Sequence, residues 1–192
     1  MNVEDTSYKL GNTKKMREKL LDVIPEIKEI KDQDLRKSVL DVWDEAMAHR
    51  NWTIEALLSI PFTLLKENVK ITFLEHVRTV CRMCLAIDDV LTEAYGARKT
   101  PVNRDYLAAG ALIADVGKLY EYEKKDGKIV KSRHGKYLRH PFTGVALGFK
   151  HNLPDEVLHI AAMHSREGDG FKRSPEAIIF HHSDFIDFDL ID

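Results

Sequence analysis

Apolar residues recur three or four positions apart along most of this chain, a spacing that places their side chains on one face of an α-helix. The pattern is clear in residues 34–47, where the apolar positions are Leu35, Val39, Leu40, Val42, Trp43 and Met47. The longest periodic run covers residues 71–95 and stops before Gly96, a residue type that often terminates helices. The periodicity therefore predicts an all-α protein.

The remaining periodic segments predict further helices, with one exception. The expected helices cover residues 14–23, 104–114, 140–151, 154–163 and 174–188. In residues 120–132, an Asp126-Gly127 pair lies between two short segments that can be extended, which is typical of a tight β-hairpin turn. We therefore expect a short β-hairpin flap near residues 120–132 in an otherwise helical chain.

The charge and the cysteine content exclude several classes of protein. The chain has 29 Lys and Arg residues against 31 Asp and Glu residues, so no overall basic field is present and we expect no nucleic-acid partner. Two cysteines cannot form a disulfide scaffold, and we expect neither a signal peptide nor a membrane-spanning segment. We expect a cytoplasmic protein without membrane association, and a helix of small residues near Ala109 permits a homodimer.

Five histidine and aspartate residues lie at helix ends or beside other charged residues. They are His76, Asp115, His140, His164 and Asp184. If their helices are neighbours, three imidazoles and two carboxylates converge, and such nitrogen and oxygen donors suit manganese, iron, nickel or zinc. The sequence therefore predicts a divalent metal site.

The order of these motifs resembles the HD-domain superfamily of metal-dependent phosphohydrolases. The resemblance covers residues 71–187 and rests on His76, Asp115-Val116-Gly117-Lys118, His140-Pro141-x-x-Gly144, His164 and Asp184. It implies a helical core that holds the metal between helices, and hydrolysis by a metal-activated water. It also implies that Asp115 is the aspartate of the His-Asp dyad and that His140 and His164 are the additional histidines of two-metal members. On this basis we expect a core of residues 71–192 with an N-terminal helical extension, residues 1–70, packed on it.

The chain departs from the family pattern at two positions. The His-Asp dyad is Ala114-Asp115 here, and His164-Ser165 stands where two-metal members often have paired histidines. Since alanine cannot coordinate a metal, we expect one divalent ion, with Mn²⁺ or Fe²⁺ favoured and Zn²⁺ or Ni²⁺ also compatible.

We assign four residues to catalysis: Asp115, Lys118, Arg139 and Arg166. Lys118 lies three residues after Asp115 and can neutralise an oxyanion, whereas the two arginines can clamp an anionic substrate through two parallel hydrogen bonds. No residue is assigned to an organic cofactor. The expected substrate is a small anionic molecule.

Three functions are compatible with these residues. The first is metal-dependent hydrolysis of a phosphoester. The second is metal-dependent hydrolysis of a carbonyl compound or a C–C bond, such as the ring opening of a cyclic diketone by a cyclohydrolase. The third is a catalytically degenerate HD module that binds a ligand, because the dyad histidine is absent.

Overall fold

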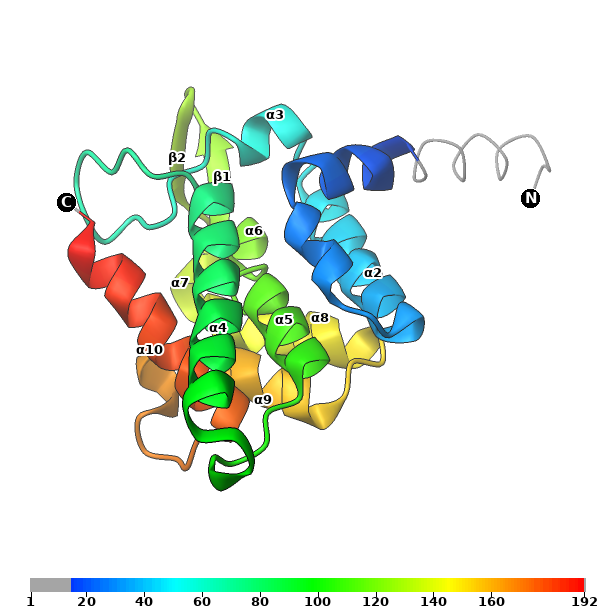
Figure 1. Cartoon of the computed structure of the whole chain (residues 1–192). Helices are drawn as coiled ribbons and strands as arrows, with labels where there is room; N and C mark the ends of the chain where they lie inside the picture. The colour runs from blue at the N-terminus through cyan, green and yellow to red at the C-terminus, as the bar shows by residue number, and fades with distance from the viewer. Residues whose placement is uncertain (1–14, 192) are drawn as a thin grey trace.

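The computed structural model describes residues 15–191, which form a helical bundle with a single two-stranded hairpin, and it confirms the all-α prediction (Figure 1). Residues 15–23 are helical, and residue 14 of the expected first helix lies outside the described part. The elements that follow are η1 (Pro25–Glu29), α2 (Gln33–His49), α3 (Ile54–Leu57), α4 (Phe73–Tyr95), η2 (Gly96–Arg98), α5 (Arg104–Ile113), α6 (Lys118–Glu121), β1 (Tyr122–Lys125), β2 (Lys128–Lys131), α7 (Arg133–Tyr137), α8 (His140–Lys150), α9 (Asp155–Met163), η3 (Arg166–Gly168) and α10 (Pro175–Leu190).

Helix α4 is the central element, and its ends follow from its sequence. The Thr72 side chain accepts a hydrogen bond from the Glu75 backbone, and the Glu75 carboxylate bonds back to the Thr72 backbone, which forms a capping box. At the other end Gly96 has a φ of +53°, a conformation that favours glycine. The buried face of α4 carries His76 among apolar residues, so the core helix itself brings a polar group to the interior.

Helix α5 packs closely between α4 and α9 because of its small residues. A Cβ atom on Gly110 would lie 2.3 Å from Cδ1 of Ile160 on α9, so only glycine allows this approach. Ala108 and Ala109 are fully buried. The close contact fixes the end of α5, after which Asp115 follows, within the bundle.

The N-terminal layer, residues 15–60, is tied to the rest of the molecule at two carbonyl groups on either side of Asp115. Nε1 of Trp43 donates to the Leu112 carbonyl at 3.1 Å, and Nε1 of Trp52 donates to the Leu119 carbonyl at 2.8 Å. Both hydrogen bonds are buried, and one apolar core runs through the layer and the following helices. The division into residues 1–70 and 71–192 stays a prediction.

The hairpin lies where the Asp-Gly pair predicted it. Strand β1 pairs antiparallel with β2, with Tyr122 opposite Lys131 and Lys125 opposite Lys128. Asp126 and Gly127 form the turn with φ values of +50° and +78°, which both residue types tolerate. The short helix α7, which the sequence pattern did not indicate, follows directly and is capped by Ser132.

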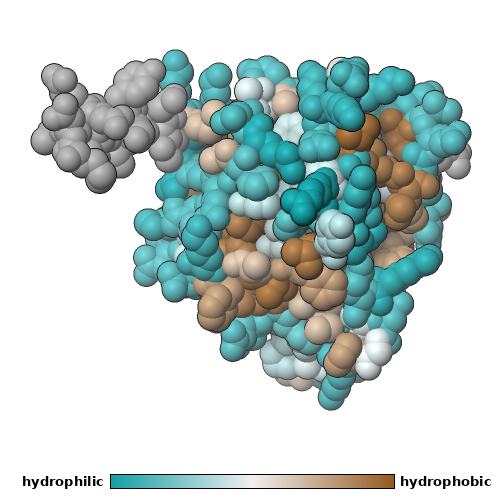
Figure 2. Space-filling view, turned by 180° about the vertical axis from the view of Figure 1, so that it is seen from behind, coloured by the Kyte–Doolittle hydropathy of each residue, from teal (hydrophilic) through white to brown (hydrophobic). Residues whose placement is uncertain are grey.

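Apolar side chains also reach the surface, and Figure 2 shows them as separate patches on one face of the molecule. Phe149, Phe171 and Tyr137 are among the large apolar residues that are more than half exposed. The expected homodimer stays a prediction. Within residues 15–191, every helix is too short or too polar to span a lipid bilayer.

Candidate metal centre

The five predicted ligands come from separate elements and meet in the middle of the bundle. His76 lies on α4, Asp115 between α5 and α6, His140 at the start of α8, His164 directly after α9 and Asp184 on α10. Each of the three histidines and Asp115 is buried, with Asp115 only 3% exposed. Residues 108 positions apart in sequence therefore share one interior site.

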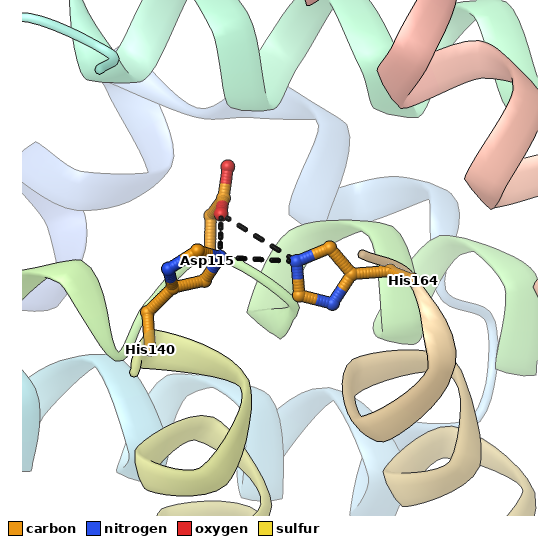
Figure 3. A group of neighbouring side chains, drawn as sticks. All are labelled: Asp115, His140 and His164. Atoms are coloured by element: carbon orange, nitrogen blue, oxygen red, sulfur yellow. Dashed lines mark hydrogen bonds and ion pairs between the residues drawn. The ribbon is translucent and has the colours of Figure 1, made fainter. Parts of the chain in front are cut away.

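One oxygen of Asp115 faces two histidines (Figure 3). Oδ1 lies 3.2 Å from Nε2 of His140 and 3.8 Å from Nε2 of His164. The two imidazole nitrogens are 3.1 Å apart. Asp115, His140 and His164 thus form a first triad of potential metal ligands.

The other oxygen of Asp115 belongs to a second triad. Oδ2 lies 2.9 Å from Nε2 of His76, and the same nitrogen is 3.1 Å from Oδ1 of Asp184. His76, Asp115 and Asp184 therefore form a group of ligands that shares only Asp115 with the first triad.

The hydrogen bonds of the outer imidazole nitrogens show that a cation fits the first triad. Nδ1 of His140 lies 3.0 Å from a Glu121 oxygen, and Nδ1 of His164 lies 2.7 Å from the Ala161 carbonyl. Both partners can only accept, so each Nδ1 carries the hydrogen, and in the neutral, metal-binding form of each ring Nε2 presents a lone pair. The two lone pairs and the Asp115 oxygen point at one another, an arrangement that is repulsive without a cation and typical of a metal site.

A cation also fits the second triad. Nδ1 of His76 lies 2.6 Å from Asp187, so this ring is surrounded by three carboxylates. Burial opposes a charge on His76, but the hydrogen bonds to Asp115, Asp184 and Asp187 raise its pKa to about 10. These carboxylates strongly favour positive charge at this point, which a divalent cation supplies.

The remaining pKa shifts hold the ligands in the forms that bind metals. Burial lowers the pKa of His164 to about 4, so its ring is neutral at pH 7. Burial also acts against the charge on Asp115, but the Lys118 ammonium and the histidines hold its pKa well below the usual range. A neutral imidazole and an ionised carboxylate are the metal-binding forms of these groups.

The two departures from the family pattern are visible in the site. Ala114 is fully buried, and its methyl side chain offers no donor to a metal. The Ser165 hydroxyl donates a hydrogen bond to Glu167.

Lys118 points inward. Its Nζ donates to Asp115 Oδ2 at 2.8 Å and to the Phe62 carbonyl at 2.9 Å, and the side chain is buried. Burial alone would lower its pKa, but the Asp115 charge raises it. Lys118 therefore acts on the orientation and charge of Asp115.

The two arginines assigned to catalysis differ in position. Arg139 directly precedes His140, with its Nε 3.2 Å from a Glu167 oxygen. Arg166 lies in η3 and is exposed, and within residues 15–191 its side chain forms no hydrogen bond or ion pair. The structure thus brings Arg139, but not Arg166, into contact with groups that touch the metal ligands.

Sequence reasoning missed two carboxylates that hold the histidines. Glu121 ends α6 and accepts hydrogen bonds from both the backbone nitrogen and Nδ1 of His140. Burial opposes its charge, yet these bonds lower the pKa of Glu121 to about 2. Asp187, which holds His76, follows Asp184 by one helical turn, and this spacing was the signal that could have indicated it.

One surface hollow lies apart from the site. It has a volume of about 730 Å³ and lies between η1, α4 and the start of α5, where Glu26, Arg82, Met83 and Arg104 line it. None of the five predicted ligands lines this hollow. The candidate site is therefore identified by its metal-binding side chains and not by this hollow.

Comparison with known proteins agrees with this geometry. The HD domain family model matches residues 73–189, from the first residue of α4 almost to the end of α10. The chain is 32% identical over 171 residues to the dihydroneopterin 2′,3′-cyclic phosphate phosphodiesterase of Methanocaldococcus jannaschii, an alignment that covers 85% of this chain and 67% of that protein. No solved structure gives a significant match. The chain belongs to the HD domain family, and it is a metal-dependent hydrolase of phosphoesters.

Proposed function

We propose that this protein hydrolyses a phosphodiester bond in a small molecule, of the 2′,3′-cyclic phosphate type. The observation that carries the proposal is the pair of buried triads that share Asp115. The similar protein of known name acts on a cyclic phosphate, which supports the same substrate class here. His76, Asp115, His140, His164 and Asp184 are the proposed metal ligands.

The donor set supports a proposal on the metal as well. Three imidazole nitrogens and two carboxylates favour Mn²⁺ or Fe²⁺, with Zn²⁺ or Ni²⁺ also compatible. Each oxygen of Asp115 faces a different triad, so we extend the expectation of one ion to a site that accommodates two. When bound, a divalent ion lowers the pKa of water from about 15.7 to near 7 and polarises a phosphoryl oxygen.

The protein side chains supply orientation and charge. Glu121 and Asp187 hold the rings of His140 and His76 so that each Nε2 faces Asp115. Lys118 keeps Asp115 in place by donating to its Oδ2. Arg139 is the proposed clamp for a phosphoryl oxygen, because its planar fork suits two parallel hydrogen bonds to one phosphate.

Arg166 has a different part in this proposal. Its exposed side chain, outside the contacts around the metal ligands, can reach only the portion of a substrate that extends into solvent. Its replacement is therefore expected to affect substrate binding weakly.

The surroundings of the triads favour phosphoester over carbonyl hydrolysis. A cyclic diketone would require an apolar pocket with one or two cations. Charged side chains instead surround Glu121, the carboxylate that holds His140: Lys131 and Arg139 lie within 4.0 Å of it, and Arg139 also pairs with Glu167. The convergence of five donors also supports a working centre over a degenerate module.

Metal analysis of matched variants tests the proposal. The full-length protein, Asp115→Ala, His140→Ala and His151→Ala are loaded with Mn²⁺ or Fe²⁺ and assayed on a nucleoside 2′,3′-cyclic phosphate. His151→Ala is the control, because this histidine pairs with Glu45 away from the triads. We expect about two equivalents of metal in the wild type and the control, about one in His140→Ala and almost none in Asp115→Ala.

Two outcomes would refute the proposal. The first is a metal content in Asp115→Ala that equals that of the wild type. The second is a fully loaded wild-type protein that cleaves no phosphodiester.

A further inference from the structure

We propose that Lys131 and Arg139 form an anion-binding pair beside the metal centre, which receives the phosphate group of the substrate. This inference rests on the proposed function and specifies how the same site recognises its substrate. Lys131 ends strand β2, and Arg139 is the residue before helix α8. The hairpin and the start of α8 thus each contribute one cation.

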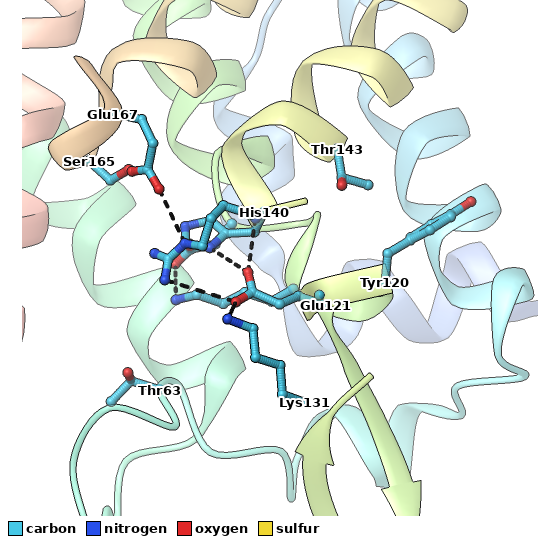
Figure 4. A network of polar contacts seen from close by, with 12 residues as sticks. Thr63, Tyr120, Glu121, Lys131, His140, Thr143, Ser165 and Glu167 are labelled. Carbon is cyan, nitrogen blue, oxygen red and sulfur yellow. Dashed lines mark hydrogen bonds and ion pairs between the residues drawn. The ribbon is translucent and has the colours of Figure 1, made fainter. Parts of the chain in front are cut away.

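Both cations face the same oxygen of Glu121. Lys131 Nζ lies 3.6 Å from Oε1 of Glu121 (Figure 4). Arg139 Nη1 lies 4.0 Å from the same oxygen. Charge-assisted hydrogen bonds are usually about 2.7–2.9 Å long, so neither cation is hydrogen-bonded to this oxygen. Within residues 15–191, the side chains of Lys131 and Arg139 donate no hydrogen bond at all.

Arg139 also has a donor that lacks an acceptor. Its Nε is buried and lies 3.2 Å from a Glu167 oxygen, but the geometry does not form a hydrogen bond. A buried N–H without an acceptor is costly, commonly about 1–3 kcal/mol, and such groups require an explanation. A small reorientation of Arg139 toward an anion would satisfy this donor.

Glu121 can lose its contacts with Lys131 and Arg139 and still accept its hydrogen bonds from His140, a proposed metal ligand. Its Oε2 accepts from the His140 backbone nitrogen at 2.9 Å and from Nδ1 at 3.0 Å. Its backbone carbonyl accepts from Ser132, and Gly135 packs so closely that a Cβ atom there would lie 2.4 Å from that carbonyl. Glu121 is therefore held in place while Oε1 faces cations that are free to take another acceptor.

A phosphate group fits these two cations chemically. It offers at least two non-bridging oxygens, one for the guanidinium fork and one for the ammonium group. Glu121 and Glu167 balance the two positive charges in the free protein, so the pair binds an anion only when that anion provides better-aligned acceptors. A neutral ligand would not compete with the two carboxylates.

Binding of inorganic phosphate to metal-loaded, full-length protein tests the pair. Isothermal titration calorimetry gives the dissociation constant for the wild type, Lys131→Gln, Arg139→Gln and the control Lys128→Gln. Lys128 is on the same strand and is exposed, and its replacement removes the same charge at the far end of the hairpin. Metal content and circular dichroism verify that each variant is loaded and folded.

We expect phosphate binding to weaken about 10-fold in Lys131→Gln and in Arg139→Gln, and less than about twofold in Lys128→Gln. KM for a phosphodiester should rise in the first two variants by a similar factor. Unchanged phosphate binding in Lys131→Gln and Arg139→Gln would refute the proposed anion-binding pair. An equal loss of phosphate binding in Lys128→Gln would also refute it, because that result would indicate a general charge effect. If the loaded wild type cleaves no phosphodiester while the phosphate affinities differ as expected, the proposed function fails and the anion site stands.

Discussion

Gly117 offers a direct test of how the Asp115 turn is positioned against His140. The residue is the N-cap of helix α6 with φ −60° and ψ −17°, an ordinary right-handed conformation that alanine also adopts. Its importance is therefore steric. A Cβ atom at this position would lie 2.2 Å from the His140 carbonyl oxygen and 2.9 Å from its carbonyl carbon.

The expected cost of Gly117→Ala follows from these distances. An ordinary contact begins at 3.4 Å, so the α6 turn and the start of α8 must separate by about 1 Å. Such overpacking costs about 1–3 kcal/mol, partly offset by about 0.4–1 kcal/mol from the more restricted unfolded chain. A net loss of about 1–2 kcal/mol lowers the Tm of a protein of this size by roughly 2–8 °C.

The same displacement affects the metal ligands. His140 Nε2 lies 3.2 Å from Asp115 Oδ1, and a shift of about 1 Å between their segments removes the alignment of the first triad. We expect Gly117→Ala to bind metal at least about 10-fold more weakly than the wild type. Differential scanning fluorimetry and metal titration measure the two effects separately.

Gly170→Ala is the matched control, because its Cβ atom would have no neighbour within 4 Å. It should retain the wild-type Tm and metal affinity. The steric argument is wrong if Gly117→Ala is as stable as this control and binds metal equally well.

Three further predictions concern the surroundings of the site. Trp52→Phe leaves the buried Leu119 carbonyl without a donor, which should cost about 1–3 kcal/mol of unfolding free energy; a denaturant midpoint identical to that of the wild type would contradict this. Glu121→Gln removes the carboxylate that orients His140 and should weaken metal binding about 10-fold to 100-fold in a competition titration, whereas wild-type affinity would exclude this role. Removal of metal by a chelator, from a free metal concentration of 100 times the dissociation constant, should lower the unfolding free energy by about 2.7 kcal/mol and the Tm by roughly 5–11 °C. The Tm of Asp115→Ala should not change on chelation, and an equal shift in that variant would place the metal elsewhere.

Much of this architecture follows from local sequence patterns. Helical periodicity indicated α2, α4, α5, α8, α9 and α10, because a stripe of apolar residues requires a core to cover it. The Asp126-Gly127 pair indicated the hairpin, because both residues tolerate the positive φ values of a tight turn. The order of histidines and aspartates indicated the family and supplied the five proposed ligands, since donor types and their order are properties of the chain alone.

The sorting of these ligands into two triads required the three-dimensional arrangement of the helices. Periodicity tells which face of a helix is buried, but not which helix lies opposite, so nothing local pairs His140 with His164 or His76 with Asp184. The inward direction of Lys118 likewise depends on the Phe62 carbonyl, which belongs to the N-terminal layer.

The carboxylates behind the histidines show the same limit. Glu121 precedes His140 by 19 residues and reaches it because β1, β2 and α7 turn the chain back on itself. Trp43 and Trp52 bond to carbonyls that are free because the chain leaves its helical path around Asp115. Residue types and helix faces are encoded over a few positions, whereas the partner of a buried polar group depends on packing between segments that are distant in the chain.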